Sequence, residues 1–302
     1  MSWAAAHRVA HMAAVQAHHD LRVVTDRFPV PVADAIEAAG VPLLWRPMSQ
    51  LFGVYLHVGD QRGILVNEGL TRAGRRHTAA HELGHHRFVH HPGPGSPCAV
   101  DVGEPAQRQH RWTPDEQVAE SFASWFLMPR KAVLAALACL GLDRPDSAAT
   151  VYQLSLLLGT TYRATVRHLV SLRLADPRTA QGWASQSPAA LKRRLLIGPL
   201  TSTRDVDVWN IQNPCIPGAR HLSPGDRVVF PRHLLLDTGG LTSADNGADS
   251  VALTGSDPGV YMLQFCSGQE TVELALVVEP RPHGLHRKVA GPTTSAVDEV
   301  TV

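Results

Sequence analysis

The sequence lacks an excess of charge of either sign. Its 302 residues include 28 lysines and arginines and 27 aspartates and glutamates, so the formal net charge is +1. Proteins that hold nucleic acid or an anionic membrane through bulk charge carry a large positive excess. The near-zero balance therefore argues against such a main function, although it leaves room for a local basic face.

Cysteine is scarce, and its spacing argues against two kinds of site. The four cysteines lie far apart and form no CxxC pair: Cys98, Cys139, Cys215 and Cys266. Such a distribution indicates neither a disulfide scaffold nor a cysteine-rich zinc site. The cysteines therefore fit a protein of a reducing compartment.

Long hydrophobic runs are also missing. The longest apolar stretch, residues 132–142, is far shorter than the roughly 20 residues that span a bilayer. At the N-terminus, His7, Arg8 and His11 interrupt the chain before the apolar core of an export signal can form. These absences predict a cytoplasmic protein without a membrane partner.

Apolar residues and histidines, in contrast, are plentiful. Apolar residues make up 44%, enough for real cores in one large or two ordinary domains. Of the 17 histidines, 11 fall within the first 91 residues. Either composition scatters them, or some of them gather around a metal ion.

The periodicity of apolar residues divides the chain into a mixed N-terminal part and a β-rich C-terminal part. Helical spacing is found over residues 2–28, 32–39, 71–91, 113–128, 130–140 and 148–174. Alternating spacing predicts strands over residues 41–46, 52–58, 62–67, 206–211, 227–230, 250–253, 259–265 and 271–278. The pattern predicts an α+β fold in which the last five strands form a small β-sandwich.

A metal-binding pattern lies in the helix predicted over residues 71–91. The segment His81-Glu82-Leu83-Gly84-His85 matches HExxH, and positions four apart lie on one face of a helix. His81 and His85 can therefore bind one Zn2+, with Glu82 beside them to take a proton from the attacking water. The small residues that precede the motif favour a buried site over a chance match on a surface helix.

A catalytic zinc site needs a third protein ligand, which should come from a second helix that crosses the first. The segment Thr113-Pro114-Asp115-Glu116 is typical of a helix start, and this helix carries Glu116 and Glu120 on one face. One glutamate can bind the metal while the other orients a ligand histidine. Glu116 can instead reach back to Thr113 in a capping box. The spacing alone therefore does not decide which of the two glutamates is the third metal ligand.

Two motifs together resemble a known family. HELGH at residues 81–85 and the segment Glu116-x-x-Ala119-x-x-Phe122-Ala123-x-x-Phe126-Leu127-Met128-Pro129 are similar to the HELGH and ExxAxxFAxxLLMP motifs of the ImmA/IrrE metallopeptidases. The similarity covers about residues 1–175 and includes the strand pattern before the first motif. The chain departs from the family at Glu120, where Asn or Asp is frequent, and at Phe126, which replaces Leu.

The resemblance implies a zincin-like catalytic domain over residues 1–145, with helices around a small three-stranded sheet. It implies one catalytic Zn2+ with His81, His85 and Glu116 as ligands. Glu82 would be the catalytic residue and Glu120 the partner of a ligand histidine. The implied activity is that of an endopeptidase with a protein substrate, often a helix-turn-helix transcriptional repressor whose cleavage starts a stress or mobile-element programme.

Three further segments follow the catalytic domain. We expect a helical, helix-turn-helix-like segment packed on it, a β-sandwich-like regulatory or binding domain and a disordered tail, over residues 146–197, 198–281 and 282–302. The helical segment carries Arg163, Arg167 and Arg173, which could enter a DNA groove, but the neutral chain favours a packing role. The β-domain is expected to bind a ligand or a partner.

Other side chains are candidates for supporting roles. Tyr55 and His110 could stabilise the oxyanion that forms during peptide hydrolysis. The remaining histidines near the motif are interpreted as mostly solvated: His77, His86, His90 and His91. One of them could also stabilise the oxyanion, and His77 and His81, four residues apart, leave a shifted metal site open. Those of the first helix are interpreted as a result of composition.

The alternative function is a zinc-containing DNA-binding or sensory regulator without peptidase activity. The helical segment motivates it. Salt-sensitive binding of a DNA duplex, without proteolysis of any partner, would favour it over the peptidase.

Overall fold

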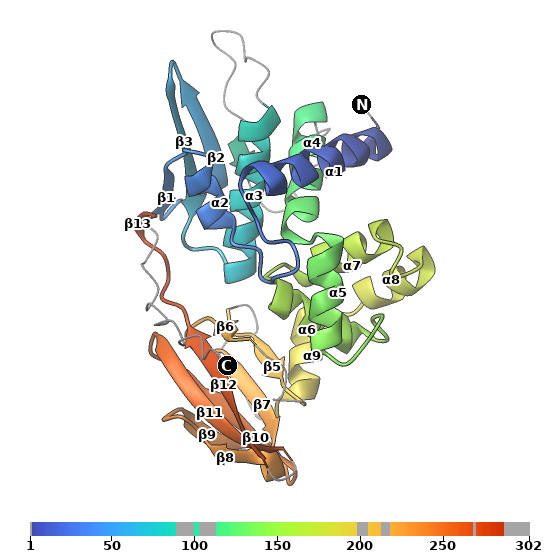
Figure 1. Ribbon diagram of the computed structural model, residues 1–302, viewed down its shortest axis with the longest axis vertical. Helices are drawn as coiled ribbons and strands as arrows, with labels where there is room; N and C mark the ends of the chain where they lie inside the picture. Colours follow the sequence, from blue (N-terminus) through green and yellow to red (C-terminus); the bar gives the residue numbers. More distant parts are fainter. Residues whose placement is uncertain are drawn as a thin grey trace, which may run out of the picture.

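The computed structural model describes residues 2–88, 100–102, 113–197, 205–212, 218–267 and 270–286. Within these ranges the protein has nine α-helices and three sheets, so the predicted α+β class is confirmed (Figure 1). The helices are α1 (Trp3–Asp20), α2 (Val32–Ala38), α3 (Arg72–Phe88), α4 (Pro114–Leu127), α5 (Arg130–Cys139), α6 (Ala148–Leu158), α7 (Tyr162–Ser171), α8 (Pro177–Ala184) and α9 (Pro188–Leu195).

The first sheet lies in the N-terminal half and has the strand order β13-β1-β3-β2-β4. Its strands are β1 (Leu43–Arg46), β2 (Leu51–Val58), β3 (Gln61–Asn67), β4 (Val100–Val102) and β13 (Gly284–Leu285). β1 runs parallel to β3, whereas β2 is antiparallel to β3 and β4 is antiparallel to β2. The three predicted strands are confirmed, and β4 adds a short strand where the sequence lacked any periodicity.

The strand β13 comes from the far end of the chain. It pairs with β1 in antiparallel register, with Leu285 opposite Leu44. The sequence predicted a disordered tail from residue 282, but the chain instead returns here to cover an edge of the first sheet. A strand of two residues has no detectable alternation, which explains the difference. Residues 287–302 lie outside the described part of the chain.

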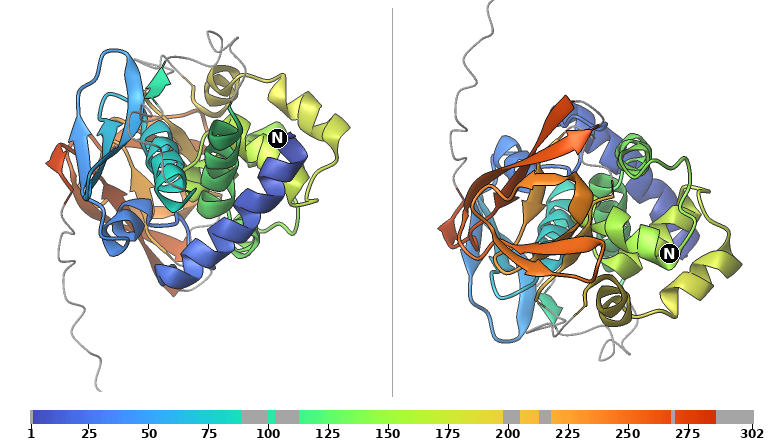
Figure 2. Two further views of the ribbon diagram at one scale, coloured as in Figure 1. Left: turned by 90° about the horizontal axis from the view of Figure 1, so that it is seen from above. Right: turned by 90° about the horizontal axis from the view of Figure 1, so that it is seen from below.

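The helix α1 packs along α4 through a stripe of small residues. Seen from above, α3 lies between the first sheet and α4, and α1 lies on the far side of α4 (Figure 2). Ala6, Ala10, Ala14 and Ala17 are spaced by three or four residues and are almost fully buried. The helix ends at Asp20 rather than at residue 28, because the chain turns at Arg22, which has a φ of 52°.

The histidines of α1 take part in this packing. Trp125 of α4 donates its indole N–H to His7, and the ring of His11 stacks on Trp125 with centroids 4.0 Å apart. His18 lies 2.8 Å from the carbonyl oxygen of Phe126. The interpretation of these histidines as a result of composition alone was therefore wrong.

The helix α4 begins and ends where the sequence predicts. The Thr113 hydroxyl accepts the amide of Glu116, and the helix stops at Leu127, two residues before Pro129. No single helix in the described part of the chain is long and apolar enough to cross a membrane. Among the described helices, α4 and α5 are the one pair that meets that length and composition together, and they are bent by 45° where they join.

The helical pair α6–α7 has the expected shape of two helices joined by a short turn. Residues 151–158 of α6 are all buried, so this helix serves as a packing element. Arg163 and Arg167 of α7 are exposed. The arrangement matches the predicted helical segment, while its contact with DNA stays a prediction.

Two four-stranded sheets form the C-terminal part. The first has the order β5 (Val208–Asn210), β7 (Arg227–Pro231), β10 (Ser250–Thr254) and β9 (Thr242–Asp245). The second has the order β6 (Arg220–Leu222), β12 (Glu270–Val278), β11 (Gly259–Ser267) and β8 (Leu235–Asp237). All five predicted strands are present. Phe230 and Phe265, one from each sheet, are fully buried with ring centroids 4.8 Å apart.

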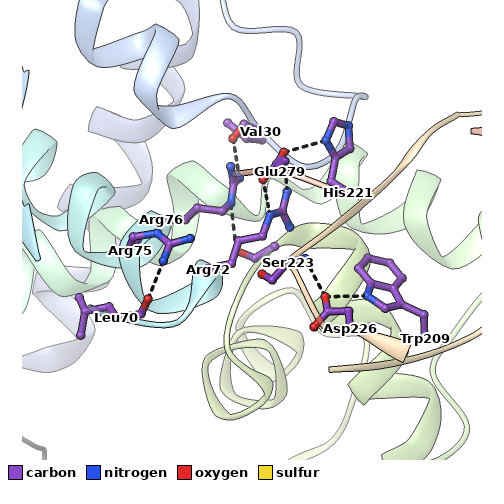
Figure 3. Close-up of polar contacts among 11 residues, drawn as sticks. Val30, Leu70, Arg72, Arg75, Arg76, Trp209, His221, Ser223, Asp226 and Glu279 are labelled. Atoms are coloured by element: carbon purple, nitrogen blue, oxygen red, sulfur yellow. Dashed lines mark hydrogen bonds and ion pairs between the residues drawn. The ribbon is translucent and has the colours of Figure 1, made fainter. Parts of the chain in front are cut away.

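A carboxylate joins the C-terminal sheets to the start of α3. Arg72 Nε lies 2.8 Å from Glu279 Oε2, and His221 Nδ1 of β6 lies 2.7 Å from Glu279 Oε1 (Figure 3). Burial raises the pKa of Glu279, but His221 and Arg72 outweigh it and hold that pKa well below its usual range. The ionised carboxylate therefore ties β6 to the helix that carries the metal-binding motif.

Candidate metal centre

The helix α3 lies at the centre of the N-terminal half. It packs against β2 and β3 on one side and against α4 on the other (Figure 2). Residues 78–84 are all buried, and His81 and Glu82 are 2% and 0% exposed. The polar motif therefore lies inside the protein, where charged groups need partners.

The side chains of His81, His85 and Glu116 converge on one point. One possible ligand atom from each lies within 4.8 Å of the others. The two histidine Nε2 atoms are 3.0 Å apart. The Glu116 carboxylate lies 3.2 Å from His81 Nε2 and 3.4 Å from His85 Nε2. Two imidazoles and one carboxylate form the donor set of a catalytic zinc site that keeps one position open.

Glu120 contacts the opposite nitrogen of His81. Its Oε2 lies 3.6 Å from His81 Nδ1 and 2.9 Å from His77 Nε2. Burial raises the pKa of Glu120, but His77 and His81 more than offset this and hold it well below its usual range. An ionised carboxylate behind His81 orients the ring so that Nε2 faces the cluster. The geometry thus separates the two glutamates that the sequence spacing left open, with Glu116 in the cluster and Glu120 behind it.

The cluster favours positive charge. Burial lowers the pKa of His81, yet its hydrogen bonds with Glu116 and Glu120 outweigh burial and raise it to about 10. Burial raises the pKa of Glu116, but His81 and His85 hold it well below its usual range. A buried group of ligands that retains a proton so firmly has the charge complement for a cation. The donor set and the charge therefore both fit a divalent metal ion.

Glu82 lies next to the cluster, and its carboxylate is buried. Both of its oxygens are buried, and neither has a hydrogen-bond partner of normal geometry among the described residues. Burial raises the pKa of Glu82 to about 7, although His81 draws it in the opposite direction. A buried carboxylate with a pKa near neutrality suits a group that takes a proton and returns it.

The strand β2 passes close to this carboxylate at Gly53. A Cβ at this position would lie 2.4 Å from Thr78 Cγ2 and 3.1 Å from Glu82 Oε1. Neither distance leaves room for a side chain. The glycine therefore allows β2 to pack closely against Glu82.

Gly84 sets the distance between α3 and α4. A Cβ there would lie 3.1 Å from Phe122 Cδ1 and 3.2 Å from Ala119 Cα. The Ala119 main chain cannot rotate away as a side chain can. Because Glu116 belongs to α4 and both histidines to α3, the spacing of these helices determines whether the three ligands meet.

We expect Gly84→Ala to lower the free energy of unfolding. Overpacking typically costs ~1–3 kcal/mol, which exceeds the ~0.5–1 kcal/mol that alanine gains over glycine within a helix. Gly182→Ala in α8 is the matched control, since a Cβ there meets nothing within 4 Å and only the gain remains. Denaturant unfolding of both variants measures the difference. A Gly84→Ala protein as stable as Gly182→Ala would show that the helices are not in tight contact.

Of the two residues predicted to stabilise the oxyanion, the structure describes Tyr55 but not His110. The Tyr55 side chain is 5% exposed, and its hydroxyl lies 3.1 Å from Nδ1 of His86, the residue after the second histidine of the motif. His110 lies outside the described residues, as do His90 and His91. The role of Tyr55 stays a prediction.

Three residues around the site were not assigned to it from the sequence. His77 and His86 were interpreted as solvated, yet they pair with Glu120 and Tyr55. Arg167, considered for DNA, lies 3.7 Å from Glu120 Oε1. His77 precedes His81 by one helical turn, and from the sequence this spacing was interpreted only as a possible shifted metal site. The contacts of His86 and Arg167 are made with residues of other elements of the fold, so the spacing of residues along the sequence does not predict them.

Comparison with known proteins bears on the N-terminal half. Residues 36–157 match the peptidase family M78, described as an IrrE N-terminal-like domain. A search of curated proteins gives no match. The matched range includes α3, α4 and all three residues of the cluster, so a metallopeptidase is indicated. The resemblance seen in the two motifs is therefore confirmed over residues 36–157, the part of the chain that is similar to an IrrE N-terminal-like domain.

Proposed function

We propose that the protein is a zinc-dependent endopeptidase that hydrolyses a peptide bond in a protein substrate. His81, His85 and Glu116 would hold the metal, and Glu82 would be the general base. The observation that supports this most is the convergence of two imidazoles and one carboxylate within 4.8 Å, beside a buried carboxylate. This combination matches the needs of metal-assisted hydrolysis.

Each residue then has a defined task. Zn2+, when bound, would lower the pKa of a water to about 7 and polarise the carbonyl of the scissile bond. Glu82 would take a proton from the attacking water and pass it to the leaving amine. Glu120 would keep His81 Nδ1 protonated and the ring fixed, while His77 and Arg167 hold Glu120 in place.

The substrate class follows from the family resemblance. We propose a helix-turn-helix transcriptional repressor, whose cleavage starts a stress or mobile-element programme. The net charge of +1 fits an enzyme that acts on a protein better than a protein that holds DNA.

A search for new protein N-termini tests this proposal. Zinc-loaded protein is incubated with the proteins of its source cells, and N-termini are compared with those after treatment by 1,10-phenanthroline. We expect a small set of new N-termini that disappears with the chelator and returns with added Zn2+, because the ligands hold the metal reversibly. New N-termini that persist without metal, or none with it, would contradict the proposal.

A further inference from the structure

A cavity of about 240 Å³ lies between the helical segment and the C-terminal sheets, away from the metal cluster. It is bounded by the end of α5, by α6 and by β5 and β6. Its lining combines apolar side chains with polar ones that could fix the orientation of a small molecule: Thr150, Gln153, Asn210, Gln212 and Arg220. The apolar lining includes Leu142, Leu157, Leu195, Trp209 and Ile211.

One buried cation faces this cavity. Arg220 lines it and is only 4% exposed. Among the described residues, no aspartate or glutamate oxygen lies within 4 Å of its guanidinium. The guanidinium donates to the carbonyl oxygen of Gly218 at 2.8 Å and to the Cys139 sulfur at 3.2 Å. These contacts use two of its five N–H donors.

Neither contact compensates the charge. Burial raises the pKa of the Cys139 thiol in spite of the neighbouring guanidinium, so the sulfur stays neutral. Cys139 is the last residue of α5, and a helix C-terminus supplies at most about half of a negative charge. A buried charge without a full counter-charge is costly. The site is therefore short of one anion.

Neighbouring carboxylates are occupied elsewhere. Asp207 accepts the ammonium of Lys192 at 2.9 Å and the hydroxyl of Tyr152 at 3.0 Å. Asp226 accepts the amides of Ser223 and Asp207, each at 2.8 Å. Neither carboxylate contacts the guanidinium of Arg220, which is left for a ligand.

We propose that this cavity binds a small organic acid. The carboxylate would pair with the guanidinium of Arg220 through the fork geometry that arginine offers. The apolar body would pack against Leu157, Trp209 and Ile211. This binding site is separate from the metal cluster, and its test does not depend on peptidase activity.

Fluorine NMR on the full chain tests the proposal with 4-fluorobenzoate as the probe. We expect saturable line broadening with a Kd below ~1 mM. The neutral isostere 4-fluorobenzamide should bind at least about tenfold more weakly, since it lacks the charge that Arg220 needs. Inorganic phosphate should not displace the probe, because it lacks an apolar body. Equal binding of acid and amide, or no saturable binding up to about 10 mM acid, would overturn the proposal.

Two variants locate the binding. Arg220→Gln should weaken 4-fluorobenzoate at least about tenfold, while Arg232→Gln, which changes an exposed arginine paired with Asp245, should leave the Kd unchanged. Removal of an uncompensated charge should not lower the thermal stability of the ligand-free protein. If Arg220→Gln fails to fold, Arg220→Lys keeps the charge but loses the fork, and weaker acid binding by that variant is expected. Undiminished binding by a folded Arg220 variant would overturn the assignment.

Discussion

Glu116→Ala is expected to lower the zinc affinity of the protein by more than about 100-fold, because it removes one of three protein ligands. Glu120→Ala is expected to lower it only by about 10–100-fold, since Glu120 acts through the orientation of His81. The difference follows from the geometry, in which the Glu116 carboxylate contacts the Nε2 atoms of both histidines. Competition with a zinc chelator of known affinity measures the zinc dissociation constant of both variants.

Asp115→Ala is the matched control for this comparison. Asp115 lies in the same first turn of α4 and is exposed, so its removal changes the charge near the helix start without touching the cluster. Its zinc affinity should stay close to that of the wild type. If Glu120→Ala lost more affinity than Glu116→Ala, the two glutamates would have exchanged roles, and the proposed ligand set would be wrong.

Glu82→Gln is expected to bind zinc like the wild type and to lose at least about 100-fold in the rate of substrate cleavage. Glutamine has the same shape, so it fits between α3 and Gly53 of β2 without a new contact. It cannot accept the proton that the carboxylate would take. Cleavage is followed with the substrate found through its new N-terminus, and zinc content is measured on the same samples.

The comparison of the two readouts separates catalysis from metal binding. If Glu82→Gln lost both its cleavage activity and its bound zinc, Glu82 would support metal binding rather than the chemical step. Undiminished cleavage with full zinc would remove Glu82 from the mechanism and would require another base.

The local part of the site could be predicted because it depends on the spacing within one helix. His81 and His85 are four residues apart, and helical geometry alone places them on one face. The choice between Glu116 and Glu120 could not be made in this way, since both share a face of α4. It depends on how α4 crosses α3, which the contact of Gly84 with Ala119 determines.

The fold was predicted where apolar periodicity is strong and missed where contacts are distant. The main strands of all three sheets follow from alternation, but β9 is exposed along its whole length and has none. β13 is held by its pairing with β1, more than 200 residues away in the sequence. The pairing of His7 and His11 with Trp125 likewise depends on the approach of α1 to α4.

X-ray absorption at the zinc edge of the zinc-loaded protein tests the central claim most directly. The account predicts one Zn2+ per chain, with two imidazole nitrogens and only oxygen otherwise, at about 2.0–2.2 Å. The spectrum of Glu116→Ala should lose one oxygen of this set or lack zinc. A sulfur ligand at about 2.3 Å, or a site with fewer than two imidazoles, would contradict the ligand set His81, His85 and Glu116.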